Sequence, residues 1–143
     1  MRNILIIFLL AVAGNSFSQT TKSVSVFLDR QHVSASADAD NSANQLNLYS
    51  NTPSAAMLKV LNPGWQKEKD WKRSFEIFDS TDKSLLKIPA ANQLSYQVSV
   101  KQLRSLLKRG SVYSIYTMAV PKDPKVAATV RVRRILVCRI NVK

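Results

Sequence analysis

Short stretches in which apolar and polar residues alternate recur along the chain, each about the length of a β-strand. Over residues 23–28, Val24, Val26 and Leu28 fall on one face and serines on the other, the period-two pattern of a half-buried strand. Similar patterns or short apolar runs predict strands over 45–50, 55–61, 74–78, 84–88 and 111–120, and one that ends at Val98. Turn-forming residues separate these segments, and 74–78 is expected to form a hairpin with 84–88.

One helix is predicted after the strand that ends at Val98. Ser99 is expected to cap its N-terminus, with Gln102 as the capping-box partner three residues later. The apolar stripe of this helix consists of Leu103, Leu106 and Leu107. Gly110 follows where a helix C-terminus favours a left-handed residue, so the helix is expected to end there.

A long strand is predicted over 130–142 at the end of the sequence. Its even positions are almost all apolar: Val130, Val132, Leu136, Cys138, Ile140 and Val142. Arg134 is the exception on that face, which predicts either a bulge that resets the alternation or a strand that runs past the sheet edge. The odd positions include Arg131, Arg133, Arg139 and Lys143.

These elements predict an all-β fold, an antiparallel β-sandwich of about seven strands with one short helix before the penultimate strand. The small polar residues of 31–44 predict a loop or a weak edge segment. The sandwich is expected to form a single domain over 19–143.

The first 18 residues have the pattern of a secretory signal peptide. A short positive start precedes the apolar run of 4–13, and Ser16 and Ser18 have the small-residue spacing of a cleavage site before Gln19. The alternative is a membrane anchor, but the run has roughly half of the ~20 apolar residues that a span needs. A periplasmic or secreted protein without a lipid is therefore expected, since a lipoprotein requires cysteine where this chain has Gln19.

The chain of 143 residues has a formal net charge of +12, and most of that charge lies late in the sequence. Residues 101–143 contain eleven Lys and Arg against Asp123 alone. This imbalance favours an anionic envelope surface, an acidic polysaccharide or an acidic protein as partner, and the alternative is a charge that serves solubility. Cys138 is the only cysteine, which excludes an internal disulfide and predicts a buried small apolar residue.

The segment from Leu107 to Tyr113 has the form L-x-x-G-x-x-Y between two predicted strands. It resembles the corner between strands E and F of fibronectin type III and other immunoglobulin-like domains, which implies that Tyr113 ties the corner to the backbone. The region 75–118 is also similar to the sorting domains of type IX secretion, through segments 75–79, 98–103 and 110–113. That similarity implies the same fold and a role in protein sorting.

No catalytic constellation is apparent. His32 is the only histidine, and although Asp29, Asp38 and Asp40 are possible partners, no nucleophile motif of the G-x-S-x-G kind exists. The carboxylate pairs Glu68/Asp70 and Asp79/Asp82 lie among lysines in turns and are expected to be solvated. An enzyme is therefore not expected, and no cofactor either, because the sequence contains no glycine-rich phosphate loop.

A metal site is not expected. Asp38-Ala39-Asp40 resembles the start of a calcium loop, but Ala43 and Tyr49 replace the glycine and glutamate that an EF-hand needs, which leaves a weak irregular site as the alternative.

Trp65 and Trp71 flank a charged segment. Trp65 is the candidate for stacking on a ligand, and Trp71 is expected in the core because it directly precedes the strand containing Phe75.

The best candidate site is basic. The expected anion-binding residues are Arg131, Arg133, Arg139 and Lys143 on one strand face and Lys101, Arg104 and Lys108 on the helix. Nucleic acid is disfavoured because Tyr116 is the only aromatic residue near these charges. The sequence thus predicts an exported, non-catalytic binding or assembly module, and the alternatives are a small envelope enzyme or a sorting-domain-like protein.

Overall fold

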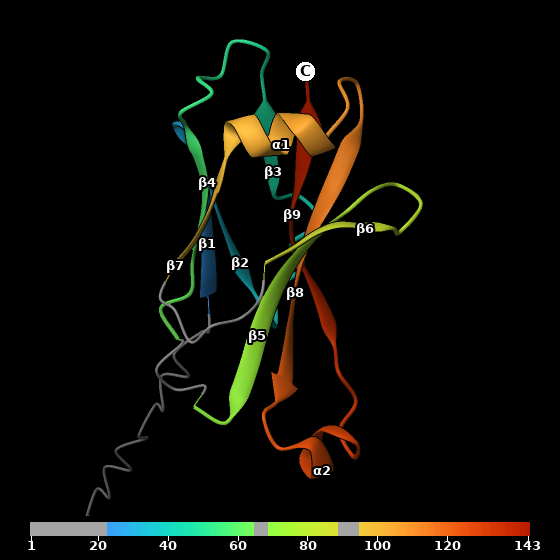
Figure 1. Ribbon diagram of the computed structural model, residues 1–143. Helices are drawn as coiled ribbons and strands as arrows, with labels where there is room; N and C mark the ends of the chain where they lie inside the picture. Colours follow the sequence, from blue (N-terminus) through green and yellow to red (C-terminus); the bar gives the residue numbers. More distant parts are fainter. Residues whose placement is uncertain (1–22, 65–68, 89–94) are drawn as a thin grey trace, which may run out of the picture.

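The computed structural model describes residues 23–64, 69–88 and 95–143, and two β-sheets pack face to face in it (Figure 1). The first sheet has the strand order β2 (Gln31–Ser36), β1 (Ser23–Leu28), β4 (Met57–Leu61), β7 (Ser95–Ser99). The second has the order β3 (Gln45–Leu48), β9 (Arg134–Val142), β8 (Val112–Pro121), β5 (Trp71–Phe78), β6 (Ser84–Ile88). Helix α1 (Val100–Leu106) precedes β8, and α2 (Pro124–Ala127) precedes β9.

This arrangement confirms the all-β sandwich with a short helix before the penultimate strand. The described residues contain nine strands rather than about seven, and β2 forms within the segment predicted as a loop or weak edge. The predicted hairpin of β5 with β6 is present. One pair departs from the antiparallel prediction, because β3 runs parallel to β9, with Leu46 opposite Ile140.

The core lies between the two sheets and is built from the apolar faces that alternation predicts. Val26 and Leu28 of the first sheet and Phe75 and Ile77 of the second are at most 1% exposed. The rings of Phe75 and Tyr96 meet across the sheets at a centroid distance of 5.1 Å. Packing of this apolar area between the sheets is the main stabilising contribution to such a fold.

Amide side chains close one open side of the sandwich. Gln31 donates a hydrogen bond to the carbonyl of Asn47 (2.6 Å) and accepts one from its N–H (2.7 Å). Asn44 donates to the carbonyls of Ser34 (2.7 Å) and Val137 (3.1 Å), which belong to different sheets. These bonds tie edge strand β2 to β3 and β9, and they give the polar segment after β1 a defined structure without much apolar burial.

Helix α1 begins as predicted but ends earlier. The Ser99 hydroxyl accepts a hydrogen bond from the Gln102 N–H at 3.1 Å, which confirms the N-cap. The helix ends at Leu106, because Leu107 adopts an extended conformation and places its side chain in the core. Gly110 has a φ of +78°, but it lies in the turn that leads into β8, so the prediction that it ends the helix is wrong.

The last strand is shorter than predicted. It begins at Arg134 rather than at residue 130, and Val132 is 40% exposed. A bulge is present, because Ile115 faces Cys138 whereas the next residue, Tyr116, faces Leu136. Val137 is thus inserted beside Cys138, and both are fully buried.

This bulge explains the position of Arg134. The alternation is reset at Val137, so an even position before the bulge faces away from the core. Arg131 and Arg133 lie before the strand starts, so the prediction that they share one strand face with Arg139 is wrong.

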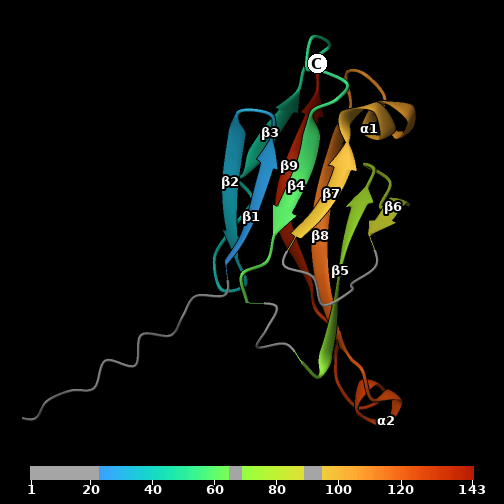
Figure 2. The ribbon, with the colours of Figure 1, turned by 60° about the vertical axis from the view of Figure 1, so that its left-hand side comes forward.

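Two strands of the second sheet extend past the first sheet. The far ends of β5 and β8 project from the sandwich, with α2 at their tip, while α1 covers the opposite end (Figures 1 and 2). Trp71 pairs with Pro121 at the end of this ladder, and the Lys122 N–H donates to the Asp70 carbonyl at 2.8 Å. We call residues 69–73 and 119–133 together the arm.

Candidate functional site

The predicted cationic residues do not form one site. Three of them, Lys101, Arg104 and Lys108, lie on or just after α1, and Lys143 follows β9 on the same side of the molecule. Arg131 and Arg133 lie in the arm at the opposite end. Arg139 lies between these groups, on β9. Trp65, Glu68 and the predicted signal peptide lie outside the described residues.

Arg104 is the central cation of the α1 end, and hydrogen bonds occupy its guanidinium. One terminal nitrogen, Nη2, donates to the carbonyls of Tyr49, Ser50 and Thr52 at 3.0, 2.9 and 2.6 Å. The other, Nη1, donates to the Ser54 hydroxyl at 3.2 Å. These four contacts fix the loop between β3 and β4 against the helix, so this side chain has a structural role.

A groove of about 450 Å³ runs beside Arg104, with Leu107 among its apolar lining residues. The two other cations that line it are Lys143, which the sequence predicts as an anion-binding residue, and Arg109, which it does not. The Nζ atom of Lys143 lies 5.9 Å from the centroid of the Tyr49 ring. The groove is therefore a wide basic depression, but the guanidinium of Arg104 is already hydrogen-bonded to the loop between β3 and β4.

The hydrogen bond that the immunoglobulin-like resemblance implies for Tyr113 is present. Its hydroxyl accepts a hydrogen bond from the Lys108 N–H at 2.7 Å, and the side chain is only 4% exposed. The bond joins the turn after α1 to the start of β8. Tyr113 therefore stabilises the corner, as Arg104 stabilises the neighbouring loop.

Among the described residues, the arm contains the largest group of basic side chains that form no ion pair or hydrogen bond. Its exposed basic residues are Lys69, Lys72, Lys122, Lys125, Arg131 and Arg133. Within the described part of the chain, none of these six side chains forms an ion pair or a hydrogen bond. The arm holds only two acidic residues, and Asp123 is occupied as the cap of α2, where it accepts from the Lys125 N–H at 2.9 Å.

The arm also exposes large apolar side chains. Trp71 is 39%, Val126 43% and Val132 40% exposed. The prediction that Trp71 belongs to the core is wrong, because β5 begins at this residue where the strand has passed the cover of the first sheet. The charged segment 66–73 around Trp71 was the signal in the sequence that could have indicated exposure.

Arg134 and Arg139 are held by contacts within the second sheet. The guanidinium of Arg134 lies 4.8 and 4.3 Å from the ring centroids of Phe78 and Tyr116, and it forms an ion pair of 2.9 Å with Asp82. Arg139 donates from Nη1 to the Ser42 carbonyl at 3.2 Å. These two arginines therefore stabilise the sheet and its flanking loop.

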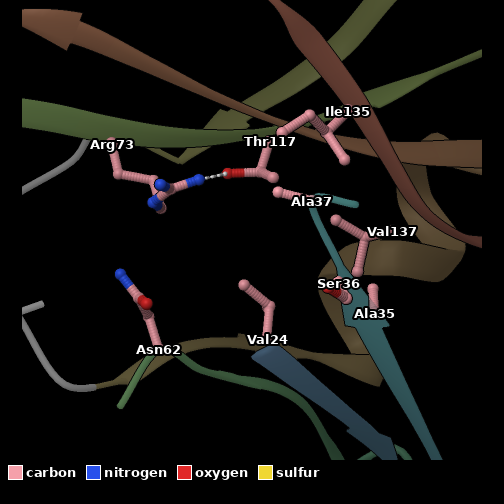
Figure 3. A pocket seen from close by; sticks show the side chains of 9 residues that line it. All are labelled: Val24, Ala35, Ser36, Ala37, Asn62, Arg73, Thr117, Ile135 and Val137. Atoms are coloured by element: carbon pink, nitrogen blue, oxygen red, sulfur yellow. Dashed lines mark hydrogen bonds between the residues drawn. The ribbon is translucent and has the colours of Figure 1, made fainter. Parts of the chain in front are cut away.

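A small cavity opens between the sheets near the base of the arm (Figure 3). Arg73 points into it and donates from Nη1 to the Thr117 hydroxyl at 3.1 Å, with Asn62 and Val24 on the facing side. The cavity volume is about 30 Å³. That space admits water, which needs about 10–15 Å³, but it is far smaller than the roughly 300 Å³ or more of a metabolite pocket.

The residues considered for catalysis are dispersed. His32 is exposed on the outer face of the first sheet, where its ring stacks on Phe27 with centroids 4.4 Å apart. Its Nε2 atom lies 3.5 Å from the Ser34 hydroxyl. Burial raises the pKa of the Cys138 thiol to about 12, so this group stays protonated inside the sheet.

Two aspartates, Asp40 and Asp79, accept hydrogen bonds within turns. A hydrogen bond from the Ser42 N–H lowers the pKa of Asp40, and one from the Thr81 hydroxyl lowers that of Asp79. Among residues 23–64, 69–88 and 95–143, no group of three His, Cys, Asp or Glu side chains is placed to hold a metal ion. In the same residues, no helix is long and apolar enough to cross a membrane.

Comparison with known proteins gives no relative. No protein-family model matches the sequence, and neither the curated proteins nor the solved structures contain a significant match.

Proposed function

We propose that the chain is an exported, non-catalytic binding module whose arm contacts an anionic partner. The observation that carries the proposal is the set of six exposed cations in the arm, none of them engaged with another described side chain. Like charges gathered on a protrusion repel one another, and a partner of opposite charge removes that repulsion and speeds association. The arm is therefore the surface most suited to such a contact.

The arm supports this function better than the α1 end does. At the α1 end the central guanidinium of Arg104 is already surrounded by four acceptors. A bound anion would compete with those acceptors and loosen the loop. In the arm, Arg131 and Arg133 keep all their donors available, and a guanidinium fork matches carboxylate and phosphate groups.

An immunoglobulin-like architecture is part of the proposal. The order β1-β4-β7 corresponds to strands A-B-E of that fold, and β9-β8-β5 corresponds to G-F-C. The Tyr113 hydroxyl at the start of β8 occupies the place of the tyrosine corner. The fold carries many functions, so it supports a binding module without naming the ligand.

Export is the second part of the proposal. The apolar run and small residues at the start of the sequence favour cleavage after Ser18 and a periplasmic or secreted protein. Intact-mass measurement of the protein recovered outside the cytoplasm is expected to give a chain that begins at Gln19. A mass that includes residues 1–18 would contradict export with cleavage at this site.

Retention on immobilised heparin tests the anionic contact. The variant Arg131→Ser/Arg133→Ser is expected to elute at clearly lower salt than the wild type, because bound counterions are released with each cationic contact. The matched control is Lys101→Ser/Lys108→Ser, which removes two exposed cations from the α1 end. Equal elution of the arm variant and the wild type, or a larger shift for the control, would refute the arm as the binding surface.

A further inference from the structure

The apolar side chains of the arm identify the kind of anionic partner. Six large apolar side chains are exposed among the described residues, and three of them, Trp71, Val126 and Val132, lie in the arm. Single exposed apolar residues are common on protein surfaces, but a concentration on one small protrusion indicates a contact site. A contact made by charge alone would gain nothing from them.

The apolar and basic residues of the arm alternate closely. Val132 stands between Arg131 and Arg133, and Val126 follows Lys125 in the exposed helix α2. Trp71 precedes Lys72 and pairs with Pro121, close to the start of α2. Each exposed apolar side chain is thus next to at least one cation.

We infer that the arm inserts its apolar side chains into the headgroup region of an anionic lipid bilayer. This inference rests on the proposed function and names its partner. Valine side chains gain free energy at the boundary of the acyl chains, tryptophan favours the headgroup level, and the surrounding lysines and arginines contact lipid phosphates. The arm lies on the surface of the bilayer, and the sandwich stays in water.

An acidic polysaccharide or an acidic protein would also meet the cations. A polysaccharide offers no hydrocarbon layer to cover Val126 and Val132, so it would leave the exposed apolar side chains of the arm in water. Any anionic bilayer offers both phosphates and hydrocarbon, whereas an acidic protein does so only through an apolar patch matched to the arm, and the experiment distinguishes the three partners.

Co-sedimentation with vesicles tests the inference. At low salt, wild-type protein is expected to bind vesicles that contain three quarters phosphatidylcholine and one quarter phosphatidylglycerol. It is not expected to bind vesicles of pure phosphatidylcholine. Arg131→Ser/Arg133→Ser is expected to bind the anionic vesicles about 30-fold more weakly, from about 1 kcal/mol for each basic residue near the surface. The same variant elutes early from heparin.

The apolar contribution is separated with a second variant. Val126→Ser/Val132→Ser keeps every charge and is expected to bind the anionic vesicles about tenfold more weakly while its elution from heparin is unchanged. Its matched control is Met57→Ser/Val112→Ser, two exposed apolar residues outside the arm, which is expected to bind as wild type. In a Trp65→Phe protein, brominated anionic lipids are expected to quench the fluorescence of Trp71.

Two results would overturn the inference and leave the proposed function intact. One is vesicle binding of Val126→Ser/Val132→Ser equal to wild type, which would show a contact by charge alone. The other is retention on heparin without binding to anionic vesicles, which would identify a polysaccharide or protein partner. If neither heparin nor anionic vesicles retain the wild type, the proposed function itself fails.

Discussion

The two ends of the sandwich are both basic, but they use their cations differently. At the α1 end, Arg104 donates to three backbone carbonyls and one hydroxyl of the loop between β3 and β4. In the arm, Arg131 and Arg133 are exposed and make no such contact with the described residues. The hydrogen-bond partners of a cation, and not its presence in a basic segment, therefore decide whether it is available to a ligand.

The apolar residues of the two ends also differ, because those at the α1 end are buried and those in the arm are exposed. Leu103 and Leu107 at the α1 end are buried, at 0% and 6% exposed, whereas Val126 and Val132 in the arm are exposed. The α1 end thus belongs to the folded core, and a change there is expected to alter stability. A change in the arm is expected to alter binding while the stability stays nearly constant.

The largest effect on stability is expected for Arg104→Met. The variant removes four hydrogen bonds that hold the loop against α1, three of which share the Nη2 atom, and a hydrogen bond to a charged group contributes about 1.5–3 kcal/mol net of the exchange with water. Because water can reach this loop, we expect a total loss of about 2–3 kcal/mol in the free energy of unfolding. Urea denaturation measures it.

Lys101→Met is the matched control for Arg104→Met, since it removes an exposed cation of the same helix that forms no hydrogen bond within the described residues. We expect a change within about 0.5 kcal/mol for this control. Both variants should bind anionic vesicles nearly as wild type. If Arg104→Met instead keeps its stability and loses binding, the division between the two ends is wrong.

The next largest effect is expected for Tyr113→Phe. The change leaves the part-buried Lys108 N–H without the Tyr113 hydroxyl as its acceptor, which costs about 1–2 kcal/mol of unfolding free energy. Tyr116→Phe is the control, because its ring stacks on Arg134 and its hydroxyl makes no hydrogen bond within the described residues. Equal melting temperatures for the two variants would show that the corner bond does not stabilise the fold.

Much of the fold could be predicted because it follows from local patterns. The alternation of Val24, Val26 and Leu28 predicted the buried face of β1, and Ser99 predicted the start of α1. The late start of β9, at Arg134 rather than at residue 130, could not be predicted in this way. Val130 and Val132 continue the apolar alternation, but the sheet that would cover them ends before those residues.

The candidate site was predictable only in part, because two distant segments build it. Arg131 and Arg133 stood out in the sequence as charged positions near the C-terminus. Lys69, Lys72 and Trp71 join them only because β5 pairs with β8 along its whole length. Pairing between strands so far apart in sequence is a tertiary property, and no periodicity within either segment indicates it.

A smaller effect is expected for Ser99→Ala. The hydroxyl satisfies the Gln102 N–H at the start of α1, and loss of such a cap costs about 1 kcal/mol. Ser105→Ala, within the same helix, is the control and is expected to change the unfolding free energy by less than about 0.5 kcal/mol. A loss of stability for Ser99→Ala that also weakens vesicle binding would couple the two ends and contradict their separation.

The smallest effect on stability is expected for Asp123→Asn, which changes the charge of the arm and keeps its structure. Asparagine caps a helix about as well as aspartate, so α2 and the unfolding free energy should change by no more than about 0.5 kcal/mol. The arm loses one of its two negative charges, and binding to anionic vesicles is expected to become about fivefold stronger at low salt.

Asp29→Asn removes the same charge at the turn between β1 and β2, where asparagine tolerates the φ of 53°. If the local charge of the arm drives binding, this second variant binds as wild type. If both variants strengthen binding equally, the net charge of the whole chain governs the contact and the arm has no privileged role. Comparison of the two variants therefore shows whether binding depends on the local charge of the arm or on the net charge of the whole protein.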